Sequence, residues 1–448
     1  ITAESIKVTV NASDGESGLA TSGTYAYYLN TESTARSTGT SNTYTYTNLI
    51  AKTQYTIKVV VKDKVGNEKE VTQTATTKKE LAKPGVIVTE TIEYEDTNGD
   101  IAVIPGGFTV SGAEGESTIE DGLVIYLIPD GTTIDWTNPT AVDTAQRTYD
   151  QFVWIPISHE QINNMYICQA KTGSNGNCNI TVVNGVAKCT THNSTQMAGR
   201  LYATGNGEKF EQGYTEVYTA NSGLREPDSI NSDNASNLTN LSSILGTTGY
   251  NTTANFKQSL QTEYNEIVKS VYENQGFYIG RYETSEMVNT NTNATVKIVA
   301  GTTEGIRNVN WYRMYAQQKK YAENKGLSSV KSTMIQGAAY DQVMKFVENG
   351  IRPNGGTYTI KTAGNASHLY LNQTGGRDET NYNDVVKNIY DLEGNVLVWT
   401  TEAEGGFTRI SRGGSYNDRY SASNRYYIIE PEYGVENIGS CIQLYIDV

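Results

Sequence analysis

The chain has 448 residues, enough for two or three domains, and hydrophobic residues make up 37% of it. Its formal net charge of −14 disfavours nucleic acid as a partner, and no apolar run approaches the roughly 20 residues that span a bilayer. The 32 tyrosines, beside abundant Asn, Ser, Thr and Gly, are typical of a binding surface or of an ordinary secreted β-rich protein.

The first part of the chain carries short alternating segments that predict strands, at residues 6–10, 25–29, 44–47, 55–61 and 70–74. Turn residues separate them, at residues 14–18, 37–39 and 65–67. Short strands at this spacing favour a β-sandwich, which we place at residues 1–82. A charged stretch that ends at Pro84 is interpreted as a linker.

Leu49, Thr53 and Tyr55 resemble the tyrosine corner of fibronectin type III domains. In that motif the tyrosine ring joins the core and its hydroxyl closes the turn onto upstream backbone. The resemblance implies a fibronectin type III-like all-β domain, of a kind that usually acts as a spacer on surface proteins.

The second domain is predicted to occupy residues 83–448 and to mix strands with helices. Its first strand candidates lie at residues 86–89, 101–104, 108–110, 123–127 and 152–157. Residues 179–188 indicate a hairpin, because Asn184-Gly185 suits a type I′ turn. We expect a long insertion at about 158–255, whose later part, residues 190–250, is poorly regular.

Three of the four cysteines lie within this insertion: Cys168, Cys178 and Cys189. We expect at least one disulfide among them, which implies an oxidising compartment. The alternative is a set of free thiols in loops. The fourth, Cys441, lies in an apolar run and is expected to be a buried, inert residue of the last strand.

Helical periodicity appears three times in the second half, at residues 257–273, 308–324 and 337–349. Gly350 is expected at the C′ position of the third helix. A strand at residues 276–283 separates the first two helices.

Three motifs carry a resemblance to the formylglycine-generating-enzyme family: residues 277–284 (FYIGRYET), 388–400 (NIYDLEGNVLVWT) and 412–416 (RGGSY). Their order and spacing agree with that family over about residues 150–448. The resemblance implies an α+β domain with a C-type-lectin-like fold, low in regular structure and with neighbouring termini.

Most motif residues have a structural interpretation. Trp399 is expected to anchor the core, and Gly413-Gly414 to let the backbone bend. Arg412 is expected to pair with a buried carboxylate or with carbonyls, with Glu283 and Asp391 as candidate carboxylates.

The family's oxidising members use two cysteines shortly after the last motif, and these positions fall near Asp418 and Ser423 here. Neither side chain can bind copper as a thiolate or perform thiol chemistry. We therefore expect no enzyme activity, no catalytic residue and no cofactor.

The segment at residues 416–437, named the C-terminal segment below, is dense in Tyr, Asn, Ser and Asp, which supply contact area and hydrogen bonds. It is similar to the variable region of diversity-generating-retroelement proteins, which use the same fold to bind receptors. A fixed loop in a non-diversified homologue is the alternative. The candidate ligand-binding residues are Tyr416, Asn417, Asp418, Arg419, Tyr420, Ser421, Ser423, Asn424, Tyr426, Tyr427, Tyr433 and Asn437.

No metal site is expected. Residues 96–100 alternate oxygen ligands as a calcium loop does, but Ile101 and Gly107 replace the Gly and Glu that such a loop needs, so a plain turn is favoured. The three histidines show no zinc-ligand spacing to a cysteine pair.

The sequence therefore predicts an extracellular or cell-surface binding protein, bacterial or phage, that recognises a protein or glycan on another cell or surface. Display on a pilus or other filament, and a homo-oligomer, are compatible with this. The alternatives are a structural subunit of an extracellular filament and an oxidoreductase related to the formylglycine-generating enzyme.

Overall fold

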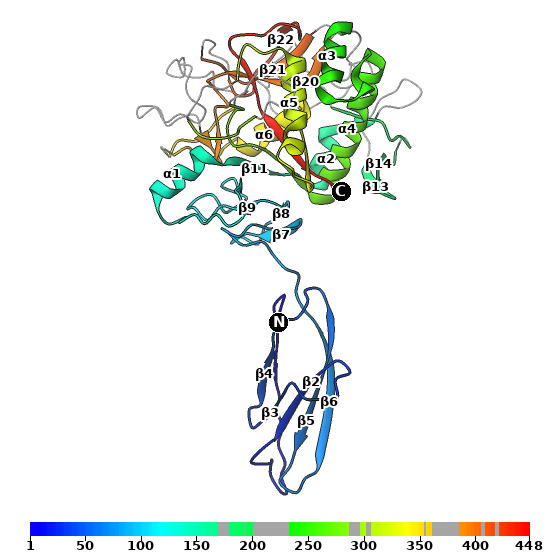
Figure 1. The fold of residues 1–448 in the computed structure, drawn as a ribbon, viewed down its shortest axis with the longest axis vertical. Coiled ribbons are helices and arrows are strands. Elements are labelled where there is room, and N and C mark those ends of the chain that lie inside the picture. Colours follow the sequence, from blue (N-terminus) through cyan, green and yellow to red (C-terminus); the bar gives the residue numbers. More distant parts are fainter. Residues whose placement is uncertain are drawn as a thin grey trace. The chain divides into compact units, whose positions relative to one another are not determined.

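A computed structural model of the chain divides into two compact units, Ile1–Leu81 and Ala82–Val448, called the first and the second unit below (Figure 1). The structure describes residues 1–168, 179–191, 193–199, 233–285, 296–301, 306–353, 355–360, 385–404, 408–416 and 421–448.

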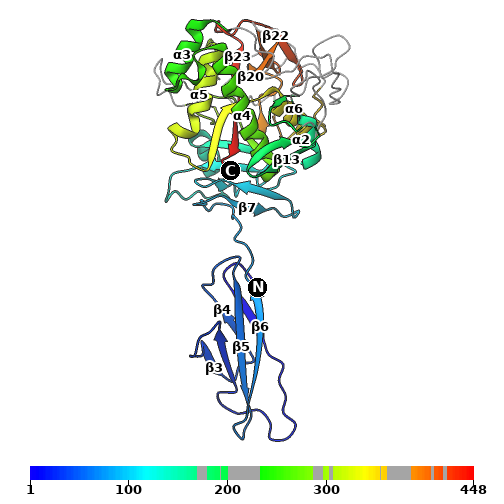
Figure 2. The ribbon, with the colours of Figure 1, turned by 90° about the vertical axis from the view of Figure 1, so that its right-hand side faces the viewer.

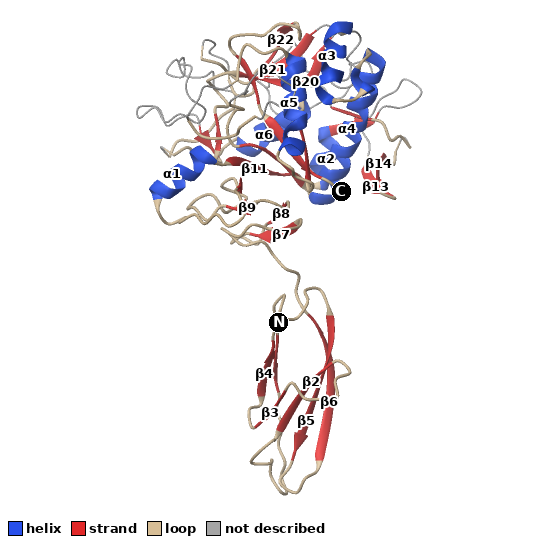
Figure 3. Cartoon of the chain, in the orientation of Figure 1, coloured by secondary structure: helices blue, strands red, loops and turns tan. Residues whose placement is uncertain are grey.

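The first unit, described throughout, is built of strands and loops (Figure 3). Its strands are β1 (Ile6–Thr9), β2 (Tyr25–Leu29), β3 (Ser37–Gly39), β4 (Thr43–Tyr46), β5 (Gln54–Lys62) and β6 (Glu68–Thr76). β1 pairs with β4, and the other four form an antiparallel sheet in the order β3-β2-β5-β6. The apolar core comes from the alternate, inward residues of these strands, among them Tyr27, Tyr46 and Ile57.

Tyr55 makes the contact that the sequence predicts. Its ring lies in the core, and its hydroxyl accepts a 2.8 Å hydrogen bond from the backbone N–H of Ile50. The turn predicted at residues 37–39 is wrong, because these residues form β3, which pairs with β2 through Tyr25 to Tyr27.

The strands of the second unit form one large sheet, one medium sheet and small pairs. The six-stranded sheet has the order β17 (Val330–Met334), β24 (Ile442–Ile446), β16 (Gly276–Gly280), β11 (Asp150–Pro156), β10 (Val124–Leu127), β9 (Thr109–Val110). The four-stranded sheet, called the C-terminal sheet below, has the order β22 (Arg425–Ile429), β21 (Thr408–Arg412), β20 (Leu397–Glu404), β23 (Ile438–Ser440). The small pairs are β7 (Ile92–Glu95) with β8 (Ile101–Ile104), β12 (Tyr166–Cys168) with β15 (Met197–Gly199), β13 (Ile180–Val183) with β14 (Val186–Cys189), and β18 (Val385–Val386) with β19 (Ile389–Tyr390).

Helices cover both faces of the six-stranded sheet. They are α1 (Pro139–Thr148), α2 (His159–Met165), α3 (Ala235–Leu245), the 3-10 turn η1 (Thr248–Tyr250), α4 (Thr253–Asn274), α5 (Trp311–Asn324) and α6 (Gly337–Val347). Successive residues of β10 enter different cores: Val124 and Tyr126 join the core that holds α2 and α6, while Ile125 joins the core that holds α3 and α5. The second unit is therefore a mixed α and β structure whose main sheet is buried on both sides (Figures 1 and 2).

The predicted hairpin at Asn184-Gly185 is confirmed. Both residues have positive φ (52° and 73°), as a type I′ turn requires, and β13 pairs with β14 on either side. At residues 96–100 the structure has a turn in which Asp96 accepts hydrogen bonds from the backbone N–H groups of Asn98 and Asp100.

Several boundaries differ from the prediction. Residues 190–250 were expected to be irregular, but α3 forms there because Asn234 caps its start and Leu238 and Leu241 face the core. The left-handed residue after α6 is Asn349, at φ 63°, rather than Gly350. Residues 86–89 are not a strand. Among the described helices, none has the length and apolar character needed to cross a bilayer.

Candidate binding surface at the C-terminal sheet

The C-terminal segment starts four residues after the end of β21, includes β22 and ends just before β23, so the C-terminal sheet positions it. β21 and β22 pair antiparallel, with Arg412 opposite Arg425, and β23 pairs parallel with β20, with Ile438 opposite Leu397. Both ends of the segment are thereby fixed to neighbouring strands. Figures 1 and 2 place β22 at the end of the second unit that lies opposite β7.

Arg412 forms a buried ion pair beneath the segment. Its guanidinium lies 2.8 Å from Asp341 of α6, and both side chains are fully buried. The same guanidinium donates to the backbone carbonyls of Asn424 at 3.0 Å and Ser423 at 3.4 Å. The predicted pairing with a buried carboxylate and with carbonyls is confirmed, and α6 supplies a carboxylate, Asp341, that the sequence did not indicate.

Two further arginines fasten the C-terminal sheet. Arg409 pairs with Asp233 at 2.6 Å, with both side chains fully buried, and its guanidinium stacks 4.8 Å from the ring centre of Trp311. Arg425 donates to Glu402 of β20 at 2.5 Å. The three arginine–carboxylate pairs thus hold three strands of one sheet by charge-assisted hydrogen bonds. The pairs of Arg409 and Arg412 are fully buried.

Residues of the three family-like motifs make further buried contacts in and beside the C-terminal sheet. Glu283 accepts hydrogen bonds from the Asn395 side chain (2.5 Å) and the Val396 backbone N–H (3.1 Å). Gly413 has φ +85°, and a Cβ there would lie 3.0 Å from the Leu392 carbonyl oxygen, so glycine is needed. Trp399 is fully buried, as predicted.

The candidate ligand-binding residues fall into three groups. Tyr433 is 63% exposed, and Tyr416, Ser421 and Asn437 are partly exposed. Ser423 and Asn424 are buried and cannot face a partner; they present their carbonyls to Arg412 instead. The rest lie outside the described residues or side chains: Asn417, Asp418, Arg419 and Tyr420, and the side chains of Tyr426 and Tyr427 in β22.

Residues 430–437 are held by contacts that the sequence did not indicate. Glu432 lies 3.4 Å from the amide nitrogens of both Asn234 and Asn237, at the start of α3. The Pro431 carbonyl accepts a 3.0 Å hydrogen bond from the backbone N–H of Trp311. These contacts join segments about 120 and 195 residues apart, so no local pattern could reveal them.

The thiol of Cys441 is free and unsuited to redox chemistry. Burial, with a further contribution from the charge of Glu283, raises its pKa to about 12, so the thiolate is scarce at neutral pH. Among the described residues, no cluster of three or more His, Cys, Asp or Glu side chains is placed to hold a metal ion.

No protein-family model matches the chain, and no curated protein does. Among solved structures, the chain is similar to a Major Tropism Determinant M1 variant, with 10% sequence identity, over 89% of this chain and 82% of that one. The TM-score is 0.26, which is too low to support an argument from this likeness.

Proposed function

We propose that the chain is an extracellular binding protein, of bacterial or phage origin, that recognises a protein or glycan on another surface through its C-terminal segment. The observation that carries the proposal is the contrast within this segment. Tyr433 is largely exposed, while the backbone around it is fastened by buried ion pairs and hydrogen bonds. We further propose that the second unit has a C-type-lectin-like fold.

Such an arrangement suits recognition, because a surface that is already ordered loses less conformational entropy when it binds. Arg412 holds the turn at residues 423–424, and the start of α5 holds Pro431. A tyrosine between such anchors offers a large contact area with few rotatable bonds.

The side chains of this region are poorly suited to catalysis. Ser423, near one of the two positions that carry cysteine in the oxidising enzymes, is buried, and the Cys441 thiol has a raised pKa. We therefore propose binding without catalysis, with the first unit acting as a fibronectin type III-like spacer. A structural role in a filament is the competing function.

Binding can be measured by incubating the labelled chain with a glycan array and with a panel of bacterial cells. We expect Tyr433→Ala, and separately the triple change of Tyr420, Tyr426 and Tyr427 to Ala, to weaken capture by about 30-fold or more, as the loss of central aromatic contacts does. Tyr28→Ala in the first unit is the matched control and should leave capture unchanged.

Capture that survives both sets of substitutions would show that the C-terminal segment is not the binding surface. If no glycan and no cell captures the wild-type chain, while the purified chain polymerises, the filament role is favoured instead.

A further inference from the structure

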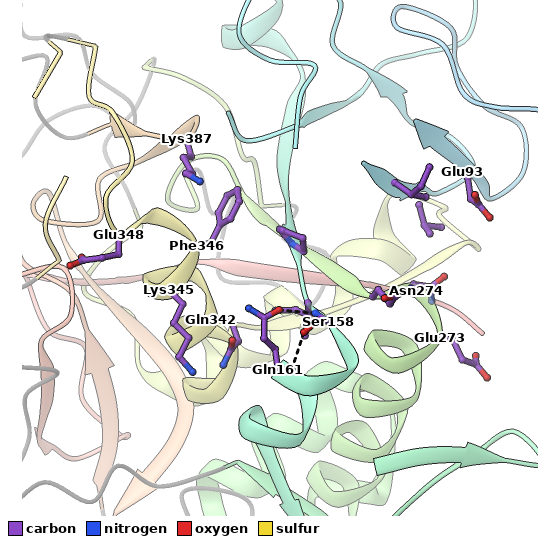
Figure 4. A pocket seen from close by; sticks show the side chains of 15 residues that line it. Glu93, Ser158, Gln161, Glu273, Asn274, Gln342, Lys345, Phe346, Glu348 and Lys387 are labelled. Atoms are coloured by element: carbon purple, nitrogen blue, oxygen red, sulfur yellow. Dashed lines mark hydrogen bonds between the residues drawn. The ribbon is translucent and has the colours of Figure 1, made fainter. Parts of the chain in front are cut away.

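A second candidate site lies in the second unit, in a cavity of about 830 Å³ (Figure 4). Its walls come from the β7–β8 hairpin, the end of β11, the start of α2, the end of α4, and α6 with the nearby Lys387. The cavity is distinct from the C-terminal segment, because none of its lining residues belongs to residues 416–437.

Gln342 of α6 is the unusual residue of this cavity. It lines the wall and is only 1% exposed, yet neither its amide nitrogen nor its amide oxygen has a hydrogen-bond partner among the described residues. Buried side-chain amides are nearly always hydrogen-bonded, since leaving them unpaired destabilises the fold. Both amide atoms are shielded from solvent, so the side chain must turn toward the cavity to meet a ligand that supplies both partners.

Other amides of the wall have spare hydrogen-bonding capacity. The Gln161 oxygen accepts from the Ser158 backbone N–H, which leaves its amide nitrogen for other partners. Asn274 donates its amide nitrogen to the Ser270 carbonyl, which leaves its oxygen. Phe346 adds an aromatic ring to the lining, with the Lys387 ammonium 4.3 Å from the ring centre.

The charged groups of the wall nearly cancel. Three carboxylates, Glu93, Glu273 and Glu348, stand against two ammonium groups, Lys345 and Lys387. A strongly charged ligand would meet as much repulsion as attraction here, so the lining favours a neutral one.

We propose that this cavity binds an uncharged saccharide of one or two rings, with the Gln342 amide bonded to its hydroxyl groups. A hydroxyl both donates and accepts, and neighbouring hydroxyls on a ring can satisfy both atoms of one amide. The C–H face of a sugar ring would rest on the apolar part of the wall. The volume lies within the range of small-molecule pockets. This site is independent of the proposed function of the C-terminal segment.

Saturation-transfer NMR on the full chain tests the proposal, with glucose, galactose, mannose, N-acetylglucosamine, maltose and lactose as separate millimolar probes. We expect transfer to at least one sugar. Gln342→Met keeps the shape of the side chain but removes both hydrogen bonds, and should weaken the binding of that sugar by about tenfold or more. Glu273→Ala, on the exposed rim of the cavity, should weaken sugar binding less, and Tyr433→Ala should not change it.

Thermal unfolding separates loss of the site from loss of the fold. Gln342→Met should melt at the same temperature as the wild-type chain or higher, because it removes an unpaired buried amide. A melting temperature several degrees lower would show that the amide has an internal partner and would overturn the proposal. Absence of transfer to every sugar, or transfer that persists in Gln342→Met and Glu273→Ala alike, would overturn it as well.

Discussion

Replacing Arg412 by Met should destabilise the second unit strongly, because the buried guanidinium donates hydrogen bonds to three acceptors. The change would leave the Asp341 carboxylate buried without this cation, and it would take a donor from the carbonyls of Ser423 and Asn424. Removing one partner of a buried ion pair typically costs about 3–5 kcal/mol, and we expect the free energy of unfolding to fall by that amount. Since these carbonyls lie inside the C-terminal segment, partner binding should weaken too.

The measurement is urea unfolding followed by tryptophan fluorescence. All four tryptophans belong to the second unit, so the signal reports on that unit alone. Lys331→Met is the control, since it breaks only partly exposed ion pairs, with Glu266 and Asp447 in the same unit, and should cost about 1 kcal/mol or less.

The double change of Arg412 to Met and Asp341 to Leu should recover much of the loss, because no buried charge then stays unpaired. If Arg412→Met alone costs no more than the Lys331 control, the buried pair does not anchor the segment and the reasoning fails.

Three other outcomes follow from single contacts. Tyr55→Phe should cost the first unit about 0.5–1.5 kcal/mol, seen as faster hydrogen exchange of its strand amides, whereas Tyr28→Phe should be neutral. Burial raises the pKa of the Cys441 thiol to about 12, above the ordinary value of 9.0, so its share of stability is complete below pH 9 and declines as pH rises toward 12. Cys441→Ala should make the alkaline decline in stability less steep above pH 9, while the share that comes from buried tyrosines such as Tyr278 and Tyr445, whose pKa values burial also raises, stays. Peptide mapping without reductant should find Cys189 linked to another cysteine of the same insertion, and finding it only as a free thiol would refute the expected disulfide.

Local signals in the sequence were reliable where one short stretch determines the outcome. Asn184-Gly185 fixed a hairpin because few other residues adopt two successive positive φ angles. The periodic apolar residues of α4 and α6 identified those helices, although their ends moved by several residues. By contrast, α3 was missed although Leu238, Leu241 and Leu245 follow helical spacing before Gly246, because the Asn, Ser and Thr residues around them are typical of a loop.

The candidate site shows the same division. The turn residue Gly413 could be predicted, since it needs a special backbone conformation. The carboxylate that pairs with Arg412 could not, because Asp341 lies 71 residues away and several acidic residues were equally plausible. Composition also failed to separate exposed Tyr433 from buried Asn424, since both belong to residue types enriched in binding loops.

The placement of the buried arginines explains how one segment could tolerate changes on its surface. Arg409 and Arg412 belong to β21, outside the C-terminal segment, and their carboxylate partners come from residue 233 and from α6. Inside the segment, Arg412 binds backbone: the carbonyls of residues 423 and 424. A carbonyl is present whatever the side chain, so this part of the anchoring does not depend on the side chains of the segment, whereas the contacts of Arg425 and Glu432 do. The stability of the platform and the identity of its contact residues are therefore largely separate properties of this fold, and selection could change the second without losing the first.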